Sequence, residues 1–333
     1  MVRLAIIFFM IWETGLGKCQ VRNRQALLDF IKVEYALDQK QFSMVKSIFF
    51  SSSYLGQGNI KISDHPICEE TCRQEHRKTK VTFKNKRFKK ICAHDFMAPL
   101  YDPVKEKAED ASTCIDQFEF PNRPCSFPIV WVRAREAAQI CHALGKRLCD
   151  AHEWEGACAG ALRQPDYRFD LVKKDHPKNS ISRMRQLHNA VQKKSKVWSY
   201  GNQFQKRICA QDSKKSRNCN GGDWLKCGSN TYPTGYFSGC HSKLDVFDLH
   251  GNAAEHMNLP LSMKQLAPKN LDHYGYTEMK GSWFIWDKYR AHPDHCRWRA
   301  PFWHGSQVMS QSSHRNYHLG FRCCLSRGGG DGS

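Results

Sequence analysis

Sixteen cysteines in 333 residues constrain the fold of this chain more than any other feature. They do not fall in the paired CxxC…CxxC arrangement that a zinc site would need. A high cysteine count in an exported chain indicates disulfides, which form and persist in oxidising compartments. The count is even if Cys19 stays in the mature chain, so all of the cysteines can pair.

The N-terminus has the layout of a secretory signal peptide over residues 1–17. Arg3 precedes an apolar run, and Gly15 and Gly17 would allow cleavage before Lys18. The apolar run is too short to span a bilayer. A lipoprotein with Cys19 as the lipidated residue and a short buried helix are the weaker alternatives. The sequence thus predicts an exported protein, periplasmic or extracellular.

The formal net charge of +19 raises the question of an anionic partner. Nucleic acid would be the usual candidate, but export argues against it. The prediction is an anionic glycan or an acidic protein surface. A membrane surface also stays open, although no later stretch is apolar enough to form a transmembrane anchor.

The first region after the signal peptide, residues 18–110, is expected to be helical and basic. Apolar residues at helical spacing predict one amphipathic helix within residues 20–50. Alternation from Lys80 to Phe88 predicts a basic edge strand, bracketed by Cys68, Cys72 and Cys92 as staples. The basic stretch 73–90 is interpreted as a solvated face, with an anion-binding patch as the alternative.

Two compact helices are predicted after residue 114. One spans residues 134–144 and stops at Gly145. Asp150 caps the second, with Glu153 three residues later completing a capping pattern. Residues 161–196 are polar and basic, and are interpreted as a partly helical surface insertion. No fixed-period repeat is present.

A candidate metal turn lies at residues 246–256 (VFDLHGNAAEH). Asp248 and Glu255 supply two carboxylates that flank a glycine-containing turn. Calcium takes six to eight oxygen ligands, so converging carboxylates and backbone carbonyls would suit it. From spacing alone, an ordinary turn is the alternative.

Several motifs together resemble the formylglycine-generating enzyme (sulfatase-modifying factor) family. They occur in the family's order over about two-thirds of the chain, and nothing before residue 92 takes part. The blocks are CIDQFEFPN (114–122), GKRL (145–148), EWE (153–155), WSYGN (198–202), YPTGYF (232–237), the 246–256 turn, GSW (281–283) and LGFRC (319–323).

The resemblance implies an α+β, loop-rich fold akin to C-type lectins, over a domain at residues 111–326 with a disordered tail at 327–333. It also implies one structural calcium ion, bound by the side chains of Asp248 and Glu255 and the carbonyls of Gly251 and Ala253.

The resemblance further implies the bridges Cys141–Cys323 and Cys158–Cys296. Cys149 and Cys324 are near neighbours of the first of these bridges and are expected to pair with each other. Two local bridges are expected among four more cysteines, with open connectivity: Cys209, Cys219, Cys227 and Cys240. Pairing stays open for Cys19, Cys68, Cys72, Cys92, Cys114 and Cys125.

The catalytic cysteine pair of the family is missing. In the family, two thiols after the GGSW block bind copper and oxidise the substrate cysteine, but Ile285 and Arg290 stand at those positions. The family serine is kept as Ser282, and His318 replaces an asparagine. Copper is therefore not expected as a cofactor.

The leading functional hypothesis is an exported binding or structural module without formylglycine-generating activity. The alternative is an oxidoreductase of the same family with rewired metal ligands, acting on a thiol substrate. Histidines crowd the C-terminal region, but their spacing matches no metal motif. They are His292, His295, His304, His314 and His318. A third hypothesis is a polyanion-binding envelope protein that uses residues 73–90.

Overall fold

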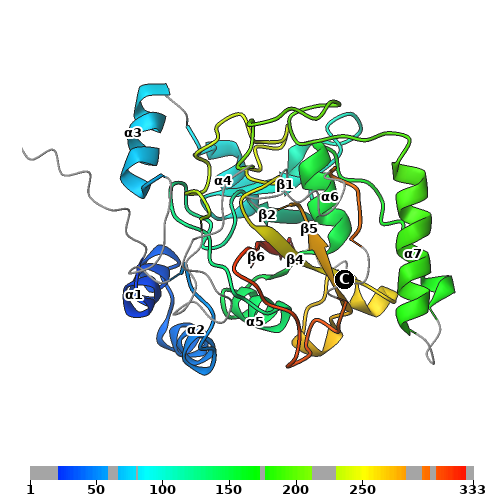
Figure 1. The fold of residues 1–333 in the computed structure, drawn as a ribbon, viewed down its shortest axis with the longest axis horizontal. Helices are drawn as coiled ribbons and strands as arrows, with labels where there is room; N and C mark the ends of the chain where they lie inside the picture. The colour runs from blue at the N-terminus through cyan, green and yellow to red at the C-terminus, as the bar shows by residue number, and fades with distance from the viewer. Residues whose placement is uncertain are drawn as a thin grey trace, which may run out of the picture.

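The computed structural model describes residues 22–58, 67–79, 82–172, 177–211, 230–282, 295–300 and 305–327. Helices surround two small sheets, as Figure 1 shows, and this mixture confirms the predicted disulfide-stapled α+β class. The helices are α1 (Arg24–Glu34), α2 (Gln39–Ser51), α3 (Glu69–Thr79), α4 (Lys86–Cys92), α5 (Ala134–Ala143), α6 (Ala151–Ala159) and α7 (Pro177–Gln192). Short 3₁₀ turns lie at Ala108–Asp110, Phe169–Leu171, Met263–Gln265 and Leu271–His273.

The C-terminal strands tie the two sheets to one another. The four-stranded sheet has the order β1-β2-β7-β3 and the three-stranded sheet the order β5-β4-β6. All pairings are antiparallel except that of β4 with β6, which is parallel. Because β6 and β7 are separated by Arg322 alone, the chain passes directly from one sheet to the other. The strands are β1 (Met97–Leu100), β2 (Thr113–Asp116), β3 (Arg147–Leu148), β4 (Ala254–Leu259), β5 (Tyr276–Lys280), β6 (Leu319–Phe321) and β7 (Cys323–Ser326).

Helices α5 and α6 confirm the two compact helices expected after residue 114. The side chain of Glu153 accepts from the Asp150 backbone N–H at 2.8 Å, which is one half of the predicted capping pair. The Asp150 carboxylate also accepts from the Asn258 side chain and from the N–H of Ala267. Asp150 therefore links α6 to the segment after β4.

The prediction of one helix within residues 20–50 is wrong, because the structure has two. Asp38 starts α2, where its carboxylate accepts from the Gln41 N–H at 2.8 Å and the Gln41 side chain accepts in return. This capping box interrupts the helix, and Ala36 turns the chain with a φ of 47°. Leu28, Val45 and other apolar residues of α1 and α2 share one buried core with α5.

The predicted basic edge strand at residues 80–88 is also wrong. Residues 80 and 81 lie outside the described part, residues 82–85 form no strand, and the last three residues, 86–88, belong to helix α4. Asn85 caps α4 by accepting from the Phe88 N–H at 3.1 Å. Phe88 and Cys92, four residues apart, are both buried on one helix face. Residues 86–88 therefore form a helix despite their alternating pattern, because Asn85 caps the helix and its apolar face is buried.

The insertion at residues 161–196 is partly helical, as predicted, but it is not only a surface feature. Ile181 and Met184 of α7 are buried in the second core cluster. Arg185 donates to Glu278 of β5 at 2.7 Å, and both side chains are buried. Helix α7 is thus fixed to the three-stranded sheet.

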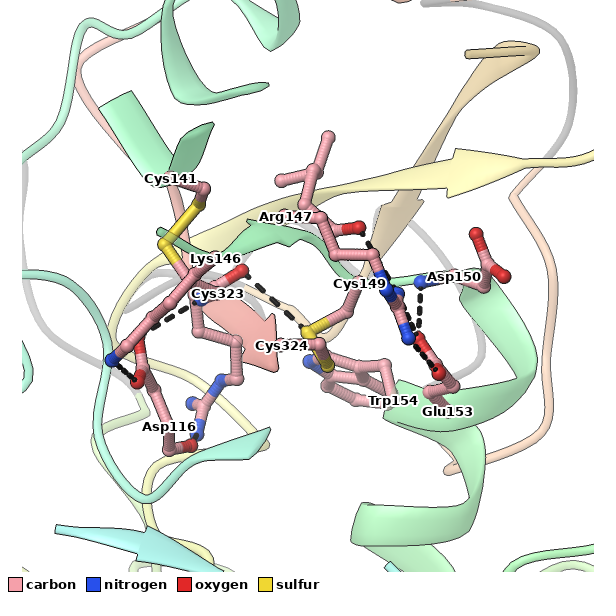
Figure 2. The surroundings of a disulfide bond; sticks show 12 residues. Asp116, Cys141, Lys146, Arg147, Cys149, Asp150, Glu153, Trp154, Cys323 and Cys324 are labelled. Carbon is pink, nitrogen blue, oxygen red and sulfur yellow. Dashed lines mark hydrogen bonds and ion pairs between the residues drawn. A yellow bond between two sulfur atoms is a disulfide. The ribbon is translucent and has the colours of Figure 1, made fainter. Parts of the chain in front are cut away.

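The predicted disulfides are present. Cys141–Cys323, Cys149–Cys324 and Cys158–Cys296 all form, and Figure 2 shows the first two bridging adjacent residues of β7. Cys209 pairs with Cys240, as one of the expected local bridges, while Cys219, Cys227 and Cys19 lie outside the described residues. The remaining described bridges are Cys72–Cys125 and Cys92–Cys114, and Cys68 is also disulfide-bonded.

The structure joins the region before residue 110 to the family-like domain. Strand β1 pairs with β2, and the Cys92–Cys114 bridge runs alongside. The division of the chain into a region at residues 18–110 and a domain at residues 111–326 stays a prediction. Within the described part of the chain, no helix is both long and apolar enough to cross a bilayer.

Candidate functional site

The turn before β4 is held in an unusual backbone conformation. Asp248, Gly251 and Asn252 have φ values of 57°, 73° and 53°. A Cβ atom at Gly251 would lie 2.1 Å from the carbonyl oxygen of Ala210, so only glycine fits there. Asn252 N–H donates to that same carbonyl oxygen at 2.8 Å. The turn is therefore shaped by contacts with a loop about forty residues earlier in the chain.

Asp248 and Glu255, the two predicted calcium ligands, lie in one buried cluster with Glu119. Glu255 accepts from Arg322 through both oxygens, each at 2.7 Å, and from the Trp154 indole at 3.2 Å. Glu119 accepts from the Ala253 N–H at 2.8 Å and from Asn252 at 2.6 Å. Asp248 accepts from the Gly235 N–H at 2.6 Å.

The cluster contains three carboxyl groups and one guanidinium, and two of the carboxyl groups have raised pKa values. Burial, and then the neighbouring Asp248 and Glu255, hold the pKa of Glu119 well above its usual range. Burial raises the pKa of Asp248 to about 7, with a further contribution from Glu255. Three carboxyl groups thus share one guanidinium, that of Arg322.

A divalent cation is predicted at this donor set, although the carboxylate oxygens of Asp248, Glu255 and Glu119 do not all lie within 4.8 Å of one another. A cation would neutralise the surplus carboxylate charge, and each carboxylate oxygen has two lone pairs, so Glu255 keeps acceptor capacity after it pairs with Arg322. Asp248, Glu255 and the carbonyls of Gly251 and Ala253 would hold the ion. Calcium there stays a prediction.

Ser282 and His318, which align with the family's active-site residues, lie next to this turn. Ser282 is fully buried, and its hydroxyl accepts from the Gly251 N–H at 2.9 Å. The His318 carbonyl accepts from the Ala254 N–H at 2.9 Å, and its ring meets that of Tyr317 edge-on at 4.8 Å. Ser282 and His318 are therefore brought to the two ends of one turn. Ile285 and Arg290 lie outside the described residues.

The described cysteines offer no thiolate to this pocket. Cys296 is the cysteine that follows GSW in the chain, and it is bridged to Cys158. All cysteines in the described ranges are disulfide-bonded. A disulfide sulfur is neither a thiolate ligand nor a redox nucleophile.

The histidine-rich C-terminal region does not form a metal cluster within the described residues. The groups of potential metal ligands in the described parts of the chain each contain one disulfide, together with His76, His250 or Glu153. His295, His314 and His318 belong to none of them, while His292 and His304 lie outside the described part.

Charged residues of the family-like motifs have structural partners in the interior. Lys146 pairs with Asp116 at 2.6 Å, and Arg147 pairs with Glu153 at 2.7 Å, as Figure 2 shows. The second glutamate of EWE, Glu155, accepts from Arg299 at 2.9 Å and from Lys280 at 3.2 Å. A buried charge is costly unless it has a hydrogen-bonded partner. These motif residues therefore pair with one another inside the fold and have a structural role.

Sequence reasoning missed two members of the acidic cluster. Glu119 lies in the CIDQFEFPN block and Arg322 in the LGFRC block, yet neither was assigned a role. Both are charged residues in otherwise apolar surroundings, which is a signal for a buried pair. Their convergence on Glu255 depends on strands far apart in the chain.

Comparison with known proteins agrees with this architecture. The profile of the sulfatase-modifying factor enzyme 1-like domain matches residues 62–327, and so begins before the first of the motifs noted above. A search of curated proteins found no match. Since the profile covers more than half of the 333 residues, the chain belongs to the sulfatase-modifying factor enzyme 1-like family.

Proposed function

We propose that this protein is an exported binding module that uses the family scaffold without formylglycine-generating chemistry. One observation carries the proposal. Ile285 and Arg290 stand where the resemblance places two thiols, and the nearby Cys296 is bonded to Cys158. Without a thiolate, the site has neither the copper ligands nor the nucleophile of that reaction.

A binding role is supported by how the scaffold is built. Family membership specifies a fold and not an activity, so function has to come from the site. Disulfides and buried ion pairs fix the interior, whereas cationic side chains on the surface can meet an anionic partner. Rigid support of surface loops lowers the entropic cost of binding.

The proposal includes one structural calcium ion at the turn between Asp248 and Glu255. Its support is the surplus of carboxylate charge around Arg322. When bound, the ion would supply charge neutralisation and fix the turn, and it would take no part in a reaction.

The activity is tested with the purified full chain and a peptide that carries the sulfatase cysteine motif, with and without copper. Mass spectrometry should detect no conversion of cysteine to formylglycine. An active enzyme of the family, assayed in parallel, serves as the control for the peptide and the reaction conditions. Turnover by this chain would overturn the non-catalytic proposal.

A further inference from the structure

A basic cavity lies beyond the ends of α6 and α7. Its volume is about 630 Å³, within the range of small-ligand sites. Five cationic side chains line it, and the lining contains no aspartate or glutamate. The cations are Arg163, Lys193, Lys194, Lys196 and Arg297.

Arg297 is the buried cation of this lining, with 5% of its surface exposed. Its Nη2 donates to the Ala161 carbonyl at 2.9 Å, while its Nε has no acceptor among the described residues. Burial lowers the pKa of Arg297 overall, although the more distant carboxylates of Glu155 and Asp166 raise it in part. No carboxylate of the described chain lies within ion-pair distance of this guanidinium. A buried cation without an ion-pair partner is costly, and an anion would reduce that cost.

Trp198 gives the cavity a second kind of contact. Its half-buried ring lines the wall beside Val197 and Asn202. The indole Nε1 is buried and has no acceptor among the described residues. An aromatic face, an amide and nearby apolar carbons suit a sugar ring, whose C–H face packs on aromatics while its hydroxyls seek hydrogen bonds.

A disulfide and several backbone hydrogen bonds hold the wall of the cavity in place. The Cys158–Cys296 bridge precedes the lining residues Ala159 and Arg297 by one position each. Cys296 N–H donates to the Val197 carbonyl at 2.8 Å. Trp198 and Gly201 exchange backbone hydrogen bonds at 2.8 and 3.1 Å. Such preorganisation favours a binding site over a loose charged surface.

We propose that this cavity binds a sulfated saccharide, with the lysines and Arg297 facing sulfate oxygens and Trp198 packing against a sugar ring. The inference rests on the proposed binding function and names its partner. A single cavity with an aromatic wall favours one or two sugar units. Non-specific nucleic-acid binding instead takes cations spread along a strand.

The test uses the full chain and a fluorescent heparin-derived tetrasaccharide at fixed ionic strength. The variant K193S/K194S/K196S should bind at least about tenfold more weakly, because three exposed cations facing sulfate are removed. It should also show a shallower dependence of affinity on salt. These lysines are exposed, so the variant should melt like the wild type.

The matched control is K84S/K86S/K90S, which removes the same charge from exposed positions in the 73–90 basic stretch. It should bind the tetrasaccharide like the wild type. Equal losses in the two triple variants, or a larger loss in the control, would overturn the proposal, since net charge or the other patch would then explain binding.

Binding measurements with other ligands identify the class of the partner. The fully desulfated tetrasaccharide should bind much more weakly, and Trp198→Leu should weaken the sulfated one. An eight-nucleotide single strand or an acidic peptide that binds as tightly through the same lysines would overturn the saccharide assignment, and so would the absence of measurable tetrasaccharide binding. Formylglycine production is measured separately, so a failure of either proposal can be recognised by itself.

Discussion

Glu255 and Arg322 form a two-point ion pair in the interior, with both carboxylate oxygens accepting from the guanidinium at 2.7 Å. Arg322 also donates to the carbonyls of Asp116, Gln117 and Phe247. It lies between β6 and β7, where the chain passes from one sheet to the other. The pair therefore joins the predicted metal turn to both sheets.

Replacing Arg322 by methionine should destabilise the fold by about 3–5 kcal/mol, because Glu255 would remain as a buried, unpaired charge. Urea unfolding measures the change. The control is Arg87→Met, which breaks the exposed pair with Glu109 and should leave the midpoint nearly unchanged. Similar midpoints for the two variants would contradict this role of Arg322.

Calcium should raise the thermal stability of the wild type. At about 100 times the dissociation constant, the gain would be about 2.7 kcal/mol. Glu255→Gln keeps the shape of the side chain but removes its charge, so this variant should hardly respond to calcium. Melting is compared in EDTA and in millimolar calcium. Equal shifts in both proteins would place the ion elsewhere.

Asp248 should make stability fall as the pH rises between about 4 and about 7. Its folded pKa is raised from 3.8 to about 7, so in this window the folded state holds a proton that the unfolded state has released. Asp248→Asn removes that term, which is on the order of a few kcal/mol. The stability advantage of wild type over variant should therefore shrink as the pH rises in EDTA.

Calcium should flatten this pH dependence in the wild type, because a bound cation favours the ionised carboxylate. Asp272→Asn, at a position with 78% side-chain exposure, serves as the control and should follow the wild type. If the free energy of unfolding of Asp248→Asn has the same pH dependence as that of the wild type, ionisation of Asp248 does not destabilise the fold.

Free-thiol counting on denatured, unreduced protein should find at most two thiols. All the described cysteines are disulfide-bonded, and export would place the rest in an oxidising compartment. Six or more thiols would argue against export.

The stability that each disulfide provides should increase with the length of the loop that it closes. Removing Cys141–Cys323, which spans 182 residues, should cost about 5 kcal/mol on the chain-entropy estimate. Removing Cys92–Cys114, which spans 22 residues, should cost about 3 kcal/mol. Paired alanine variants and urea unfolding test the order, and a reversed order would show that local packing outweighs loop closure.

The sequence by itself determined the family, the helices α5 and α6, and three disulfides. The motifs carried this information because they stand in a fixed order with local signals, such as Gly145 at a helix end and Glu153 within hydrogen-bond reach of Asp150. Local signals also misled where a cap overrode periodicity. Asp38 divided one expected helix into two, and Asn85 began a helix where alternation indicated a strand.

Only the tertiary structure decided which charges meet. Glu119, Glu255 and Arg322 are separated by more than sixty residues from one another, and strand pairing alone brings them together. The basic cavity likewise needs the ends of α6 and α7 to meet Arg297. A sequence shows which residues can carry charge, but burial and distance set the energy of that charge, and both arise only when distant segments pack.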